Sequence, residues 1–98
     1  MACTYIIHSN TLKKYYIGAC HQSVQDRIDA HNSGKYGSHR FTAIANDWEL
    51  VLILECDNYG HALRLERKIK RVKSSRYIKN LVQFEEMRDR IINETKNI

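Results

Sequence analysis

Two short segments at the start of the chain have the residue pattern of β-strands. Residues 3–8 are β-branched or aromatic with a weak alternation, and residues 14–18 repeat this pattern. Turn-forming side chains at 9–11 separate the two segments. The short connection predicts an antiparallel hairpin.

A helical pattern follows the hairpin. Ser23 is a good N-cap residue, and Asp26 stands three positions later, which resembles the spacing of a capping box. The helix is predicted to end near Asn32, because Gly34 is suited to the C′ position that follows a helix.

The middle of the chain contains a loop and a third strand. Residues 33–47 are rich in glycine and serine and show neither the helical period of about 3.6 residues nor the strand period of about 2. They are predicted to form a functional loop. Residues 50–54 are apolar without interruption. Such a run is typical of a strand that is covered on both faces, so residues 49–56 are predicted to form a central strand.

The C-terminal part of the chain is predicted to be helical. Asp57 or Asn58 can cap a first helix, and Ser74–Ser75 breaks it and caps a short helix that ends near Val82. A last amphipathic helix covers about residues 84–95. The order of elements predicts a small antiparallel sheet flanked by helices, an α+β fold. The apolar positions of the first and last helices are Ala62, Leu65, Ile69 and Val72, and Phe84, Met87, Ile91 and Ile92.

Length and composition limit this fold. The 98 residues, 43% of them hydrophobic and 28% charged, predict one globular domain over 1–98 with its core over about 3–82. No apolar run is long enough for a membrane span, and no secretory signal is expected. Three widely spaced cysteines argue against a disulfide framework and for a reducing cytoplasm.

Positive charge is concentrated in one segment. The chain has a net charge of +5, but residues 61–80 hold eight basic side chains and one acidic one, a net +7. Such a patch indicates a polyanion partner, most often nucleic acid. The alternative is a solvated helix face that serves solubility. The candidate nucleic-acid-binding residues are Lys35, Arg40, Arg64, Arg67, Lys70, Arg71 and Lys73.

Two tyrosines are candidates for chemistry. Because side chains alternate along a strand, Tyr16 and Gly18 share a face, and a hairpin in suitable register would place Tyr16 beside Tyr5. The glycine leaves room for a backbone or a ligand to approach. A tyrosine can act as a general base when a nearby cation or metal lowers its pKa. Half-buried tyrosines are also ordinary strand residues.

Three further polar side chains fit the same chemistry. Arg27 and His31 are one helical turn apart and point the same way, so the first can grip a phosphate while the second relays a proton. Glu66 is the one acid in the basic segment, and Mg²⁺ needs only one or two protein carboxylates. The plainer interpretation is a helix surface with ion pairs.

Other classes of site are not indicated. Five histidines and three cysteines occur without a C-x-x-C or H-x₃-H pair, which argues against zinc. No glycine-rich phosphate loop, G-x-S-x-G elbow or dinucleotide fingerprint is present. The cysteines are interpreted as small buried hydrophobic residues rather than reactive thiols.

Placed on their predicted elements, these residues resemble the GIY-YIG endonuclease superfamily, and in particular its small stand-alone bacterial members. Tyr16-Ile17-Gly18 reproduces the second tripeptide, whereas Cys3-Thr4-Tyr5 keeps only the tyrosine of the first. Residues 26–35 are similar to the family's Arg-x-x-x-His-Asn-x-Gly stretch, and residues 62–70 are similar to its glutamate helix. The resemblance covers about 3–82.

The resemblance implies a three-stranded antiparallel sheet with flanking helices and a hydrolase that cuts phosphodiester bonds in DNA. It also implies one divalent metal, Mg²⁺ or Mn²⁺, with Glu66 as its ligand. Asn80 is a further candidate for the site. The residues carried over as catalytic are Tyr5, Tyr16, Arg27, His31 and Glu66.

The leading hypothesis is therefore a metal-dependent endonuclease. Tyr5, alone or with His31, would deprotonate the attacking water, Tyr16 would orient it, and Arg27 would neutralise charge on the scissile phosphate. A domain this small is expected to select DNA by shape, ends, branches or single strands rather than by a long sequence. DNA repair, recombination, mobile-element transfer and defence all stay open as pathways.

Two other functions compete with the nuclease hypothesis. A nuclease fold can bind nucleic acid without cutting it, and the basic helices support that hypothesis equally well. A protein-interaction domain would use the apolar face of residues 84–92.

Overall fold

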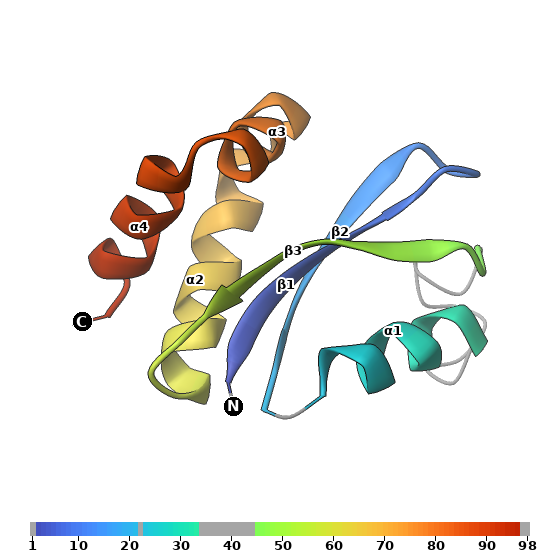
Figure 1. Ribbon diagram of the computed structural model, residues 1–98, viewed down its shortest axis with the longest axis horizontal. Coiled ribbons are helices and arrows are strands. Elements are labelled where there is room, and N and C mark those ends of the chain that lie inside the picture. The colour runs from blue at the N-terminus through green and yellow to red at the C-terminus, as the bar shows by residue number, and fades with distance from the viewer. Residues whose placement is uncertain (1, 22, 34–44, 97–98) are drawn as a thin grey trace.

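The fold consists of a small sheet with helices on both sides (Figure 1). The computed structural model describes residues 2–21, 23–33 and 45–96. The strands are β1 (Cys3–Ser9), β2 (Lys14–Cys20) and β3 (Trp48–Glu55). The helices are α1 (Val24–Ser33), α2 (Tyr59–Val72), α3 (Ser75–Gln83) and α4 (Glu85–Glu94).

The predicted functional loop lies almost wholly outside the described residues, and Gly34, Lys35 and Arg40 lie outside them as well. None of the helices in the described part of the chain combines the length and the apolar character needed to cross a lipid bilayer.

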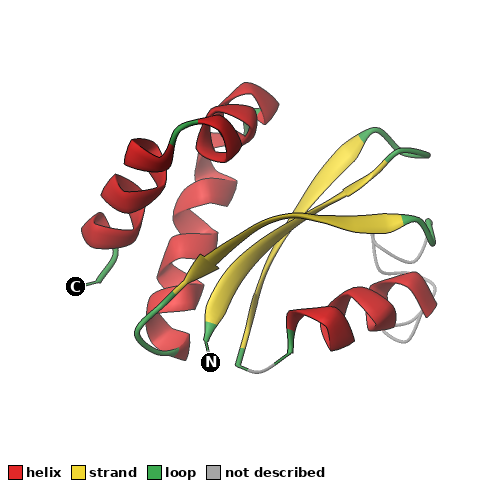
Figure 2. Cartoon of the chain, in the orientation of Figure 1, coloured by secondary structure: helices red, strands yellow, loops and turns green. Residues whose placement is uncertain are grey.

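The three strands form one antiparallel sheet in the order β2-β1-β3 (Figure 2). β1 is therefore the central strand, and six of its seven residues are buried. The hairpin register places Tyr5 opposite Gly18 and Ile7 opposite Tyr16. These pairings confirm the predicted hairpin and the predicted α+β fold with its three-stranded antiparallel sheet.

The prediction that residues 49–56 form a central strand is wrong, because β3 pairs with β1 alone among the described strands. Leu50 and Ile53 of β3 are 44% and 43% exposed. A register shift in the pairing with β1 explains the misleading apolar run. Trp48 and Leu54 would share a face in a regular strand, yet they pack into cores on opposite faces of the sheet. The inward-facing side of β3 therefore changes along the strand, and its two ends pack on opposite faces of the sheet.

The sheet divides the hydrophobic core into two clusters (Figure 1). On one face, Tyr5, Ile7 and Trp48 pack with Ile28 of α1. On the opposite face, the sheet packs against apolar residues of α2, α3 and α4. The site residues of β1 and β2 therefore lie on the face that α1 covers. The second cluster consists of Ile6, Ile17, Leu54, Leu65, Ile69, Ile78, Leu81 and Ile91.

Side-chain caps fix where three of the helices begin, as the sequence predicts. Ser23, Asn58 and Ser74 each accept a hydrogen bond from the backbone N–H three positions later, at 3.2, 2.8 and 3.2 Å. Each cap satisfies one of the N–H groups that a helix start leaves without an internal partner. The break at Ser74–Ser75 and the helix that follows it are confirmed.

The apolar face of α4 packs against the rest of the protein. Ile91 is buried in the core, and Met87 and Ile92 pack partly against it. Phe84 precedes the helix and is 48% exposed. The interaction surface proposed over residues 84–92 is thus largely used inside the domain.

Candidate active site

Tyr5 and His31 form a buried pair between the central strand and α1. The Tyr5 hydroxyl lies 3.0 Å from His31 Nε2, which is hydrogen-bonding distance. Tyr5 is 1% exposed and His31 is 4% exposed. His31 therefore reaches from α1 to the sheet and lies in the interior of the protein.

Asn32 fixes the end of α1 that carries His31. The Trp48 N–H donates to Asn32 Oδ1 at 2.7 Å, and Asn32 Nδ2 donates to the Trp48 carbonyl oxygen at 3.1 Å. This two-point clamp joins the last turn of α1 to the first residue of β3. Asn32 was not among the predicted site residues, although it follows His31 directly in the sequence.

Gly18 makes the position of Tyr5 possible. A Cβ atom at Gly18 would lie 2.5 Å from both Cζ and Oη of Tyr5, far inside van der Waals contact. The space that the sequence analysis reserves for a backbone or a ligand is thus filled by the Tyr5 ring. The glycine of the Tyr16-Ile17-Gly18 tripeptide positions the other tyrosine.

Tyr16 also contacts the His31 imidazole. Its ring meets His31 edge to face, with ring centroids 4.9 Å apart, and Lys70 Nζ lies 5.5 Å from the Tyr16 ring centroid. Tyr16 is half-buried, whereas Tyr5 is fully buried. The prediction that the two phenols share a face is confirmed, with His31 contacting both rings.

Burial and a neighbouring cation hold His31 in its neutral form. Burial and, to a smaller extent, the positive charge of Arg27 together lower the pKa of His31 from 6.5 to about 4. The imidazole is therefore neutral at physiological pH. A neutral imidazole can accept the proton of the Tyr5 hydroxyl through Nε2.

The Arg27 side chain extends from α1 to the end of β2, where it borders a polar pocket. Its Nη2 donates to the Ala19 carbonyl oxygen at 3.1 Å. The side chain borders a cavity of about 400 Å³ that is also lined by His21 and Tyr59. The rings of His21 and Tyr59 stack with centroids 3.8 Å apart. Neither residue is among the predicted site residues, although His21 directly follows β2 and Tyr59 is the first residue of α2.

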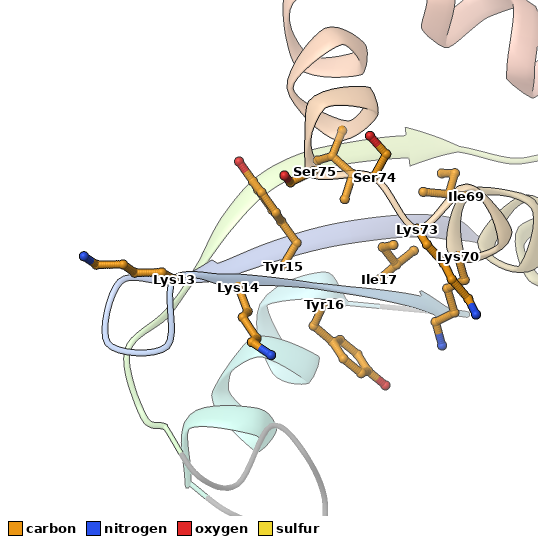
Figure 3. Close-up of a pocket in the computed structure, with 11 residues that line it drawn as sticks. Lys13, Lys14, Tyr15, Tyr16, Ile17, Ile69, Lys70, Lys73, Ser74 and Ser75 are labelled. Carbon is orange, nitrogen blue, oxygen red and sulfur yellow. The ribbon is translucent and has the colours of Figure 1, made fainter.

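Glu66 lies on α2, which packs along β2. Its Oε1 accepts a hydrogen bond from Lys70 Nζ at 3.1 Å, and its side chain is 17% exposed. Because Lys70 also lies over the Tyr16 ring, it connects Glu66 to Tyr16 at the outer edge of β2 (Figure 3). The acid and the tyrosine–histidine pair thus approach from different layers of the fold.

Asn80 stands apart from this arrangement. Asn80 is half-buried on α3, and within the described residues no hydrogen bond or ion pair joins it to the tyrosines, Arg27, His31 or Glu66. Lys35 and Arg40 lie outside the described residues.

The basic residues of α2 divide between two surfaces. Lys70 and Lys73 face the edge of β2 beside Tyr16. Arg64 donates instead to the carbonyl oxygens of Thr95 and Lys96, both at 2.9 Å, near the end of α4. The predicted basic segment is therefore not one continuous binding surface. The residues around this second surface are Arg64, Arg67, Lys68, Arg71, Glu94 and Thr95, and they line a cavity of about 370 Å³.

A divalent metal would rest mainly on one protein ligand. Among the described residues no group of three or more His, Cys, Asp or Glu side chains could hold a metal ion. Mg²⁺, however, keeps several waters and takes only one or two carboxylates together with substrate phosphate. The Glu66 carboxylate is a hard oxygen ligand of this kind, so the site fits a metal that is shared with the substrate.

The sheet, the paired tyrosines and the arginine–histidine helix together describe a nuclease fold. This chain belongs to the GIY-YIG family, because the model of the GIY-YIG catalytic domain matches residues 1–80. Membership confirms the resemblance and implies DNA as the substrate. No curated protein and no solved structure matches the chain.

Proposed function

We propose that the protein is a divalent-metal-dependent endonuclease that hydrolyses phosphodiester bonds in DNA and selects its substrate by structure rather than by a long sequence. The observation that most supports this proposal is the hydrogen bond between Tyr5 and a neutral His31, with Tyr16 in contact with the same imidazole. The Tyr5 hydroxyl can pass its proton to the His31 imidazole, and the Tyr16 ring contacts that imidazole on the face of the sheet that α1 covers.

The tyrosines and His31 would handle the proton of the attacking water. His31 Nε2 accepts the proton of the Tyr5 hydroxyl, and Tyr5 in turn accepts a proton from water. Tyr16 is the less buried phenol and orients that water by a hydrogen bond.

Arg27 would couple substrate binding to the strength of this base. In the free protein its positive charge lowers the pKa of His31. A phosphate bound at Arg27 offsets that charge and raises the pKa of His31, while burial, the larger cause of the shift, still holds it below the ordinary value. The imidazole becomes a better proton acceptor when DNA is in place, and Arg27 neutralises charge that builds on the phosphate.

Glu66 would hold Mg²⁺ or Mn²⁺, which supplies positive charge next to the leaving oxygen when bound. In the free protein Lys70 forms an ion pair with the Glu66 carboxylate. An ion pair between positions i and i+4 of a helix contributes only about 0.3–0.5 kcal/mol to stability. This pair is too weak to exclude a divalent cation, and Lys70 is free to turn toward DNA phosphate.

The same Glu66–Lys70 pair is the observation that favours a second function, a nucleic-acid-binding module without cleavage. In that case Glu66 is a helix ion-pair partner and the tyrosine–histidine pair is part of the core. The two functions differ in what removal of the carboxylate does.

Cleavage assays on labelled single-stranded, duplex and branched DNA, with Mg²⁺ or Mn²⁺ and with EDTA, separate the two functions. Glu66→Gln and Arg27→Ala are each expected to lower the rate by roughly 10²–10³-fold. Glu55→Gln removes an exposed carboxylate on β3 and is the matched control, expected to cut like the wild type. Cleavage retained in Glu66→Gln would remove Glu66 from the mechanism. Binding without cleavage in wild type and variant alike would establish the binding module.

A further inference from the structure

A cavity of about 630 Å³ lies beside Tyr16, and its lining residues other than Tyr16 and Lys70 have no role in the proposed chemistry (Figure 3). The start of β2, the end of α2 and the start of α3 enclose it. Tyr15 and Tyr16 point to opposite sides of β2, so the cavity follows the outer edge of this strand. Its volume is within the range of sites that hold small organic ligands.

The rim and the floor of this cavity differ in chemistry. Four lysines stand around it, and no acidic residue is among the described residues that line it. The floor is apolar and consists of Ile17, Ile69 and Ile78. The rim suits phosphate groups, and the floor suits a flat apolar surface. The four lysines are Lys13, Lys14, Lys70 and Lys73.

An unpaired nucleotide presents both of these surfaces, and a base pair does not. In a duplex the base faces are covered by stacking and only phosphates and groove edges reach a protein. In a single strand the bases can turn out and rest on aromatic or apolar side chains while cationic side chains follow the backbone. An apolar floor below a ring of lysines therefore favours a single strand.

The backbone at this cavity supplies a second, independent observation. Lys13 and Lys73 are the non-glycine residues with positive φ among those described, at 54° and 52°, and both line the cavity. Lys13 is in the turn between β1 and β2, and Lys73 caps α2. Glycine is the usual residue in both settings, because a side chain is disfavoured in the left-handed region. Backbone strain of this kind persists where the surrounding structure holds it, and it is concentrated at active sites and ligand-binding sites.

We propose that this cavity binds an unpaired nucleotide next to the bond that is cut, so that the substrate class is DNA with a single-stranded segment. The proposal rests on the endonuclease function inferred above, since Tyr16 belongs to both sites. Lys70 and Lys73 contact the phosphates nearest Tyr16, and Lys13 contacts a phosphate farther along the strand. The base rests on the isoleucine floor.

Binding without cleavage tests the assignment. The full chain is titrated, in EDTA, into a fluorescently labelled single strand and into the same sequence as a blunt duplex, and anisotropy is recorded at several salt concentrations. The wild type is expected to bind the single strand more tightly. Lys13→Gly and Lys73→Gly are each expected to weaken single-strand binding by roughly fivefold to tenfold. Each is also expected to reduce the slope of log K against log salt concentration by about 0.7.

Two controls keep loss of charge and loss of fold apart. Lys79→Ala removes an exposed lysine of α3 that does not line the cavity, and it is expected to leave the preference for the single strand unchanged. Each glycine variant removes a lysine whose backbone is in the left-handed region, where glycine is favoured. The Tm of each variant is therefore expected to equal or exceed that of the wild type. Weaker binding by a protein of undiminished stability then points to the lysine side chain.

Three results would overturn the assignment: duplex bound as tightly as single strand, glycine variants that bind like the wild type, or an equal effect of Lys79→Ala. The endonuclease proposal fails separately. A chain that binds the single strand as expected but cuts nothing with Mg²⁺ keeps the nucleotide site and loses the nuclease. A chain that cuts DNA while both glycine variants bind and cut like the wild type keeps the nuclease and loses this site.

Discussion

At the scale of single residues, His31 ties the stability of the protein to pH. The pKa of His31 is about 4 in the folded protein and near 6.5 when the chain is unfolded. Between these values the unfolded chain binds more protons, so the free energy of unfolding falls as the pH drops through this interval. The expected loss is about 3 kcal/mol from neutral pH to below about pH 4, measured by urea unfolding.

His31→Gln is the comparison for this effect, because an amide stays polar without titrating. The variant is expected to lose much less stability between neutral pH and about pH 4.5. Asp47 adds to acid sensitivity only at lower pH, since hydrogen bonds from Ser9 and Thr11 hold the pKa of its carboxyl at about 2. An equal loss in both proteins would show that His31 is not the residue that titrates.

The sequence predicts some of these residue-level facts and not others. The shared face of Tyr5 and Tyr16 follows from strand alternation and the hairpin, and both are local properties. The burial of His31 depends on how deeply α1 packs on the sheet, which a mostly polar helix does not reveal. The left-handed backbone of Lys13 and Lys73 is equally hidden, because lysine is not a residue that signals a positive φ.

At the scale of elements, the two leucines near the ends of β3 are expected to differ greatly. Leu54 is 1% exposed and Leu50 is 44% exposed. Leu54→Ala should lower the free energy of unfolding by about 2–5 kcal/mol, because it leaves a cavity in the core, whereas Leu50→Ala should lower it by less than about 1 kcal/mol. Chemical denaturation of the two variants measures the difference. Similar losses would mean that both faces of β3 are covered.

Helix starts were more predictable than strand positions. Ser23, Asn58 and Ser74 act through bonds to residues three positions away, so their effect is visible in a short stretch of sequence. The place of β3 at the edge and its register shift depend on pairing with β1, which is distant in sequence. An apolar run does not distinguish a strand covered on both faces from one whose inward side changes partway.

At the scale of the whole molecule, α4 completes the domain although the family match ends at residue 80. His61 of α2 is fully buried, and its Nε2 lies 3.0 Å from both the Ile92 carbonyl oxygen and Thr95 Oγ1. Ile91 enters the core beside α2 and α3. Without α4 the polar His61 ring and the apolar core would both meet water.

A chain that stops after residue 83 is therefore expected to lose more than about 3 kcal/mol of stability, or to lose cooperative unfolding altogether. A chain that stops after Lys96 keeps every contact described for α4 and is the control. Thermal unfolding followed by circular dichroism distinguishes them. A shortened chain with an unchanged Tm would make α4 an appendage of a smaller fold.

The contact between Gly18 and Tyr5 has a consequence for how such sequences change over time. A methyl group at position 18 collides with the ring carbon Cζ as well as with the hydroxyl, so removal of the hydroxyl alone does not make room. A lineage that gains a side chain at position 18 must therefore already have a smaller residue at position 5, whereas Gly18 places no such condition on a change at position 5. Related sequences that carry a side chain at position 18 should therefore lack an aromatic ring at position 5.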